Sequence, residues 1–123
     1  MKDKMTKPYA LIVEDDPGLG EVFSITLRDV FETEICSSGT LALARLGKLI
    51  PAIVVLDLHL PGASGKDILK YIKSDERFNK IRVILCTADD HEANILQDEV
   101  DIVLLKPVSP SQLREFASRM LVV

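Results

Sequence analysis

The sequence predicts an α/β fold, a doubly wound sandwich built on a five-stranded parallel sheet. Short apolar segments alternate with helix-period segments along the 123 residues, and this alternation is typical of βαβ units. The segment at 53–57 is the most apolar of them, which indicates a strand near the centre of the sheet. Because βαβ crossovers are right-handed, helices are expected on both faces.

The first strand is expected at Tyr9–Val13 and the second at Thr33–Ser37. Between them, Asp16 can act as the N-cap of a helix that has Pro17 at its first position, where the missing amide hydrogen costs nothing. The second segment is shorter and more polar than the first, as is typical of an edge strand.

Ser38 can cap a second helix, which is expected to end at Gly47. The third strand is expected at Ile53–Asp57. Gly and Pro in the segment 60–65 predict a loop after this strand, and the apolar positions of 68–72 predict the third helix.

The last part of the chain repeats the same alternation. Strands are expected at Arg82–Thr87 and Asp101–Lys106, with a short, weakly patterned helix at His91–Gln97 between them. The residues at 109–112 read Ser-Pro-Ser-Gln, which predicts a capping box at the start of the final helix. All of 1–123 is therefore expected to form a single domain, with 1–8 as a polar N-terminal extension.

Carboxylates follow two of the predicted strands directly. Glu14, Asp15 and Asp16 come after the first strand, and Asp57 ends the third. The carboxyl ends of parallel strands share one edge of a sheet, so these groups are expected in one crevice. Two like charges about 4 Å apart repel by roughly 4 kcal/mol at an effective dielectric near 20. The cluster therefore predicts a hard divalent cation.

Three more polar residues are expected at the same edge: His59, Thr87 and Lys106. A carboxylate such as Asp57 can attack phosphorus and form an acyl phosphate. Mg²⁺ would offset the negative charge, the ammonium of Lys106 would add a second positive charge, and the hydroxyl of Thr87 would donate to a phosphoryl oxygen. The pattern indicates a phosphoryl-transfer site.

Composition excludes several other classes of protein. The formal net charge is −4 and Lys and Arg do not cluster, so direct nucleic-acid binding is not expected. No apolar segment approaches the roughly 20 residues that span a bilayer, and the polar N-terminus lacks a signal-peptide core, so a cytoplasmic location without membrane contact is expected. Cys36 and Cys86 lie in predicted strands and are expected to be buried free thiols.

Four segments occur in a fixed order: Leu-Ile-Val-Glu-Asp-Asp at 11–16, Val-Leu-Asp-Leu-His-Leu-Pro-Gly-Ala-Ser-Gly at 55–65, Ile-Leu-Cys-Thr-Ala at 84–88 and Leu-Leu-Lys-Pro at 104–107. Each is a weak signal alone, but the ordered set covers essentially the whole chain. It resembles the receiver domain of two-component response regulators. This resemblance implies a flavodoxin-like fold with strand order 2-1-3-4-5.

The resemblance also implies the role of each site residue. Asp57 would accept a phosphoryl group from a partner histidine kinase or phosphotransfer protein, and an unidentified effector would respond. Asp15 would bind Mg²⁺ directly and Glu14 through water, and the backbone carbonyl of His59 would complete the protein ligands, whereas Asp16 would only cap the helix. Thr87 would be the switch hydroxyl and Lys106 the lysine that binds the phosphoryl group. The peptide bond between Lys106 and Pro107 would be cis.

Two features depart from the family pattern. Val103 stands where the family commonly has Tyr or Phe, and the segment from Thr87 to Lys106 is shorter than usual. These departures leave open an alternative function, that of a binding module which keeps the receiver fold but signals constitutively or through a ligand. A small metal-dependent phosphatase is a further alternative, but His59 stands where such an enzyme needs a second acid/base carboxylate. The phosphorylated domain is expected to be a signalling module and not a turnover enzyme.

Overall fold

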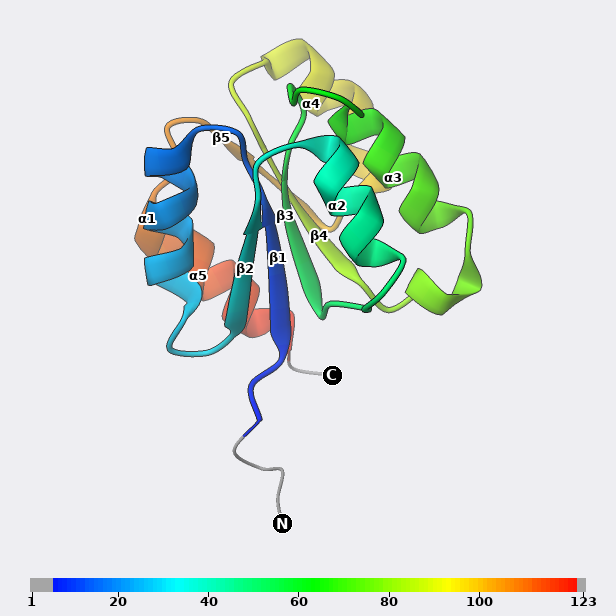
Figure 1. Cartoon of the computed structure of the whole chain (residues 1–123). Coiled ribbons are helices and arrows are strands. Elements are labelled where there is room, and N and C mark those ends of the chain that lie inside the picture. Colours follow the sequence, from blue (N-terminus) through cyan, green and yellow to red (C-terminus); the bar gives the residue numbers. More distant parts are fainter. Residues whose placement is uncertain (1–5, 122–123) are drawn as a thin grey trace.

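The computed structural model describes residues 6–121, which form one parallel sheet between two layers of helices (Figure 1). The strand order is β2-β1-β3-β4-β5, as the resemblance to receiver domains implies. The strands are β1 (Tyr9–Val13), β2 (Glu32–Cys36), β3 (Ile53–Asp57), β4 (Arg82–Thr87) and β5 (Ile102–Leu105). The helices are α1 (Pro17–Leu27), α2 (Gly39–Leu46), α3 (Gly65–Lys73), α4 (Asp90–Leu96) and α5 (Pro110–Arg119), with short 3₁₀ turns η2 (Glu76–Phe78) and η3 (Gln97–Glu99).

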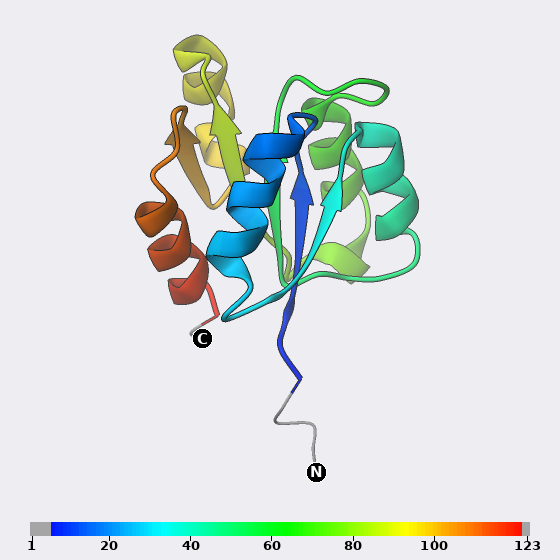
Figure 2. The same cartoon turned by 60° about the vertical axis from the view of Figure 1, so that its left-hand side comes forward.

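Each face of the sheet has its own hydrophobic core. Helices α1 and α5 lie on one face, and α2, α3 and α4 on the other (Figures 1 and 2). Phe23 of α1 and Leu113 of α5 are almost fully buried against β1, β3 and β4. On the opposite face, Ile68 of α3 and Leu46 of α2 are equally buried. All five residues of β3 are buried, which confirms its predicted central position.

The strands all run in the same direction, so their carboxyl ends meet at one edge of the sheet (Figure 2). Side-chain caps fix where helices begin at this edge. The carboxylate of Asp16 accepts the amide hydrogens of Gly18 and Leu19, as predicted, and Pro17 occupies the first position of α1. Ser38 caps α2 through the amide of Leu41, again as predicted.

Two strands differ from the prediction in their boundaries. The second strand begins and ends one residue earlier than Thr33–Ser37, because the amide of Glu32 already donates to Pro8. The fifth strand is Ile102–Leu105, so the predicted Asp101–Lys106 is one residue too long at each end. The backbone amides of Asp101 and Lys106 still donate to β4, at 3.0 and 2.8 Å, and so extend the contact beyond the strand itself.

The helical elements differ from the prediction in four places. The fourth helix is Asp90–Leu96 in place of His91–Gln97, since Asp89 caps it, and the chain continues into η3. The capping box at 109–112 forms only in part: Ser109 accepts the amide of Gln112. A complete box instead begins α3, between Ser64 and Asp67, where none was predicted. The turn η2 has no counterpart in the sequence prediction.

Candidate functional site

The ends of β1 and β3 bring three carboxylates together. These strands are adjacent and paired in register, with Val13 opposite Leu56. One oxygen each from Glu14, Asp15 and Asp57 lies within 4.8 Å of the others. The predicted cluster is therefore present in the structure. Asp16 is not part of it because its side chain caps α1.

Two of these carboxylates are buried and one is exposed. The exposed fractions of Glu14 and Asp57 are 2% and 7%, whereas Asp15 faces solvent. Burial raises the pKa of Glu14, and the negative charge of Asp57 adds to this, although hydrogen bonds from Asp16 and Lys106 oppose it. Burial thus destabilises the ionised form of Glu14, and nearby positive charge offsets this desolvation penalty.

Lys106 supplies one such charge. Its ammonium nitrogen lies 3.1 Å from Oε1 of Glu14 and 3.5 Å from Oδ2 of Asp57. Burial alone would lower the pKa of Lys106, but the hydrogen bond to Glu14 and the charges of both carboxylates outweigh burial and raise it. The lysine therefore stays positively charged beside Asp57. The bond between Lys106 and Pro107 is cis.

Thr87 ends β4 at the same edge and is 1% exposed. Its hydroxyl oxygen accepts the amide hydrogen of Asp89 at 3.0 Å, and its backbone carbonyl accepts the amide of Lys106. These two contacts place a hydroxyl and an ammonium on neighbouring strand ends. The structure thus brings Thr87 to the edge of the sheet at which Asp57 lies.

The loop after β3 carries His59, whose amide donates weakly to Oδ1 of Asp57 at 3.4 Å. Its imidazole Nε2 lies 3.3 Å from Oε1 of Glu92 in α4. Lys66 of α3 contacts the same carboxylate at 3.0 Å. Sequence reasoning missed Glu92 and Lys66. The only signal was the spacing of Asp89 and Glu92, which also fits an ordinary helix start.

The donor set at the strand ends fits a hard divalent cation. Three carboxylates share a small volume with one ammonium group, and carboxylate oxygens are preferred ligands of Mg²⁺. A dication would neutralise the excess negative charge around buried Glu14 and Asp57. A second group, formed by His59, Asp89 and Glu92, is also close enough to share a ligand, but Lys66 already neutralises its central carboxylate.

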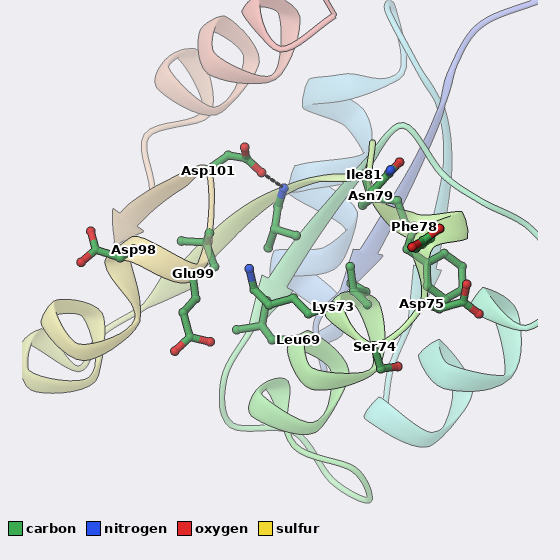
Figure 3. Close-up of a pocket in the computed structure, with 14 residues that line it drawn as sticks. Leu69, Lys73, Ser74, Asp75, Phe78, Asn79, Ile81, Asp98, Glu99 and Asp101 are labelled. Atoms are coloured by element: carbon green, nitrogen blue, oxygen red, sulfur yellow. Dashed lines mark hydrogen bonds between the residues drawn. The ribbon is translucent and has the colours of Figure 1, made fainter.

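A wide cavity of about 610 Å³ lies far from these groups, at the opposite end of the sheet. Figure 3 shows its lining, in which Leu69 and Lys73 of α3 face Glu99 and Asp101 across the hollow. The carboxylate of Asp101 accepts a hydrogen bond from the amide of Val83 at 2.7 Å. Carboxylates line this cavity too, but among residues 6–121 none of them belongs to a group close enough to share a metal ion, so the candidate site is the acidic edge.

The fold and the site together define a doubly wound α/β protein with an acidic cluster at the carboxyl ends of its strands. Comparison with known proteins gives the family. The sequence model of the response regulator receiver domain family matches residues 10–118. The chain therefore belongs to the receiver domain family of response regulators.

Two curated relatives illustrate how the family uses this domain. The DNA-binding response regulator MtrA of Mycolicibacterium smegmatis is 33% identical over 107 residues, which are 84% of this chain and 46% of MtrA. The hybrid signal transduction histidine kinase D of Dictyostelium discoideum is 28% identical over 110 residues, which are 87% of this chain and 7% of the kinase. The chain thus spans less than half the length of either relative.

Solved structures have the same fold. A putative response regulator from Chloroflexus aurantiacus superimposes with a TM-score of 0.87 at 24% identity, over 96% of this chain and 100% of that one. The BeF3-activated receiver domain of DrrB superimposes with a TM-score of 0.84 at 26% identity, over 94% of this chain and 98% of that one. DrrB is described as a Thermotoga maritima protein.

Proposed function

We propose that Asp57 is the phospho-accepting residue of this receiver domain. The observation that carries the proposal is its setting: a buried carboxylate at the end of the central strand, with Lys106 at 3.5 Å and Glu14 and Asp15 beside it. A carboxylate so placed has the counter-charge of Lys106 and two further carboxylates with which it could share a cation. Receiver domains act in two-component phosphorelay signalling, and this assignment gives that activity a position in the chain.

The chemistry follows from the positions of the side chains. One oxygen of Asp57 forms a bond to phosphorus, and the bond from phosphorus to the donor atom breaks, its electron pair leaving with the donor. Lys106 stabilises the negative oxygens of the transferring group, and the hydroxyl of Thr87 turns from Asp89 to donate to one of them. Mg²⁺, when bound, would neutralise charge on the carboxylate and the phosphoryl oxygens.

Glu14, Asp15 and Asp57 are the proposed metal ligands, together with the backbone carbonyl of His59. Support for the first three comes from the common volume that their oxygens share. Support for His59 comes from its amide, which donates to Oδ1 of Asp57 and so holds the loop against the carboxylate. The domain would carry its phosphoryl group as a signal and would not turn over free substrates.

The proposed donor is a phosphohistidine on a sensor histidine kinase or a phosphotransfer protein. MtrA binds DNA as a whole regulator, whereas this chain corresponds to less than half of it. We infer that the downstream partner recognises the phosphorylated domain by protein contact.

In residues 6–121 no helix is both long and apolar enough to cross a membrane. A cytoplasmic location and a single domain over 1–123 stay predictions; of the polar extension 1–8, residues 1–5 lie outside the described part.

Incubation with acetyl phosphate tests the proposal. The intact mass should increase by one phosphoryl group when Mg²⁺ is present, and not when it is removed with a chelator. The variant Asp57→Asn should gain none, while Asp29→Asn, which changes an exposed carboxylate two residues beyond the end of α1, should react like the parent. Incorporation by the Asp57 variant would contradict the assignment. A folded parent that never reacts would favour a module that signals without phosphorylation.

A further inference from the structure

The first turn of α4 is tied to the loop that follows Asp57. Oε1 of Glu92 lies 3.3 Å from Nε2 of His59, and Oε2 lies 3.0 Å from the ammonium of Lys66. His59 lies two residues beyond Asp57, and Lys66 is the second residue of α3. One carboxylate on α4 therefore contacts both ends of the β3–α3 loop.

The same turn is also tied to β4. The amide of Asp89 donates to the hydroxyl of Thr87 at 3.0 Å, and the carboxylate of Asp89 accepts the amide of Glu92 at 3.0 Å. If Thr87 turns toward a phosphoryl group, the first of these bonds breaks. A movement of Thr87 or of His59 would therefore change the contacts of Glu92.

Glu92 is unusually enclosed for a surface ion pair. Its side chain is 20% exposed, compared with 70% for His59 and 55% for Lys66. Within residues 6–121, its Oε1 atom is buried and has no hydrogen bond of good geometry, despite the nearby imidazole. The carboxylate also lines a small cavity of about 190 Å³ with Leu58 and Ser64. Such an atom gains or loses interactions when the loop moves slightly.

We propose that Glu92 is a positioning residue that couples α4 to the β3–α3 loop through His59 and Lys66. The inference rests on the proposed function of Asp57, since it concerns how that site reaches the outer helix. Glu92 does not touch the reacting atoms. It holds the loop that carries the proposed carbonyl ligand, and it transmits a shift of that loop to α4. By linkage, an ordered α4 should in turn favour the bound metal.

The variant Glu92→Gln tests the coupling because it keeps the size of the side chain and removes its charge. Asp90→Asn is the matched control. It makes the same charge change in the same helical turn, at an exposed position with no side-chain partner among the described residues. Lys66→Met breaks the other end of the bridge and provides a second variant should Glu92→Gln fail to fold.

The readout is the amide spectrum of the full chain, titrated with Mg²⁺ and then with beryllofluoride. In the parent and in Asp90→Asn, the amides of Ala93 and Leu96 should shift on addition. In Glu92→Gln and Lys66→Met, those shifts should fall roughly threefold, and the Mg²⁺ dissociation constant should rise by a similar factor. Leu58, next to Asp57, should still respond in every variant.

Equal α4 shifts in Glu92→Gln and the parent would overturn the proposal, as would a parent whose α4 amides do not respond at all. Intact-mass analysis of the same samples separates this result from failure of the proposed function. If Asp57 is not the acceptor, either the parent gains no phosphoryl group or Asp57→Asn gains as much mass as the parent. If only the coupling is absent, phosphorylation proceeds and the α4 response is independent of Glu92.

Discussion

Asp15 and Asp16 are neighbours in sequence but contact different partners. An oxygen of Asp15 lies within 4.8 Å of those of Glu14 and Asp57, whereas Asp16 accepts the amide of Gly18 at 2.9 Å. Sequence alone separates them only through Pro17, which marks the start of the helix and makes Asp16 its cap. The direction of each side chain then follows from the backbone.

Asp15→Asn should weaken Mg²⁺ binding by at least about tenfold, because a charged ligand is lost. Asp16→Asn should change the affinity far less, since Asn still caps a helix. Titration calorimetry on both variants measures the difference. Similar losses in the two would mean that the acidic pair is Asp15 and Asp16 and that Glu14 plays only a structural part.

The thiols of Cys36 and Cys86 should be inert in the folded protein. Both are free and buried, as predicted, and burial raises the pKa of Cys36 to about 11 and that of Cys86 to about 12. In the unfolded chain the thiols titrate near their usual pKa. Their contribution to stability is therefore complete below that pKa and is lost as pH rises through the folded values.

Alkylation with iodoacetamide at about pH 8.5, near the usual thiol pKa, checks this. Neither cysteine should react in the native protein, and both should react in urea. Stability should also fall between about pH 9 and 11, and it should fall less steeply in a Cys36→Ala variant. Rapid modification of native Cys86 would show that the end of β4 opens readily.

Close backbone approach at the start of α3 fixes the loop beside the site. A Cβ added at Gly65 would lie 2.5 Å from the carbonyl oxygen of Asp57 and 2.7 Å from Cα of Leu58. Both are backbone atoms, so the strand end itself would have to move. At Gly47, by contrast, the nearest atom would be 3.4 Å away, an ordinary contact.

Gly65→Ala should therefore cost about 1–3 kcal/mol of stability through overpacking, and it should weaken Mg²⁺ binding because Asp57 shifts. Gly47→Ala should change stability by less than about 1 kcal/mol. Urea unfolding of the two variants gives the comparison. A Gly65 variant as stable as the Gly47 variant would mean that the loop is freer than its contacts indicate.

Strand β5 should respond little to phosphorylation. Val103 is stiff about χ1 and too short to move between buried and exposed positions, unlike an aromatic residue. The change should instead be concentrated in residues 88–98, which include α4. Hydrogen exchange with and without beryllofluoride measures both segments. Large protection changes at 101–105 with none at 88–98 would refute this.

Element boundaries show what local sequence signals determine. The start of α1 follows from Asp16 and Pro17, whose preferences are local, and the prediction is confirmed. The box at Ser64 and Asp67 was obscured by the Gly-rich loop before it, in which a turn and a helix start look alike. The start of α4 is set by its cap Asp89, one residue before the predicted start, and its end by the continuation of the chain into η3.

For the molecule as a whole, parallel topology made most of the site predictable. Glu14 and Lys106 are 92 residues apart yet hydrogen-bonded, because the carboxyl ends of parallel strands must share an edge. The contact between His59 and Glu92 could not be predicted in this way. It depends on where α4 lies relative to the loop after β3, which strand topology does not determine.

The central claim is that Asp57 carries the phosphoryl group, and locating the modified residue tests it most directly. After reaction with acetyl phosphate and Mg²⁺, borohydride reduces an acyl phosphate to an alcohol, which converts the modified aspartate to homoserine. Peptide mass mapping should then find homoserine at position 57 alone, and only in the presence of Mg²⁺. Homoserine at Asp15, at any other carboxylate, or at none while the intact mass still increases, would contradict the account.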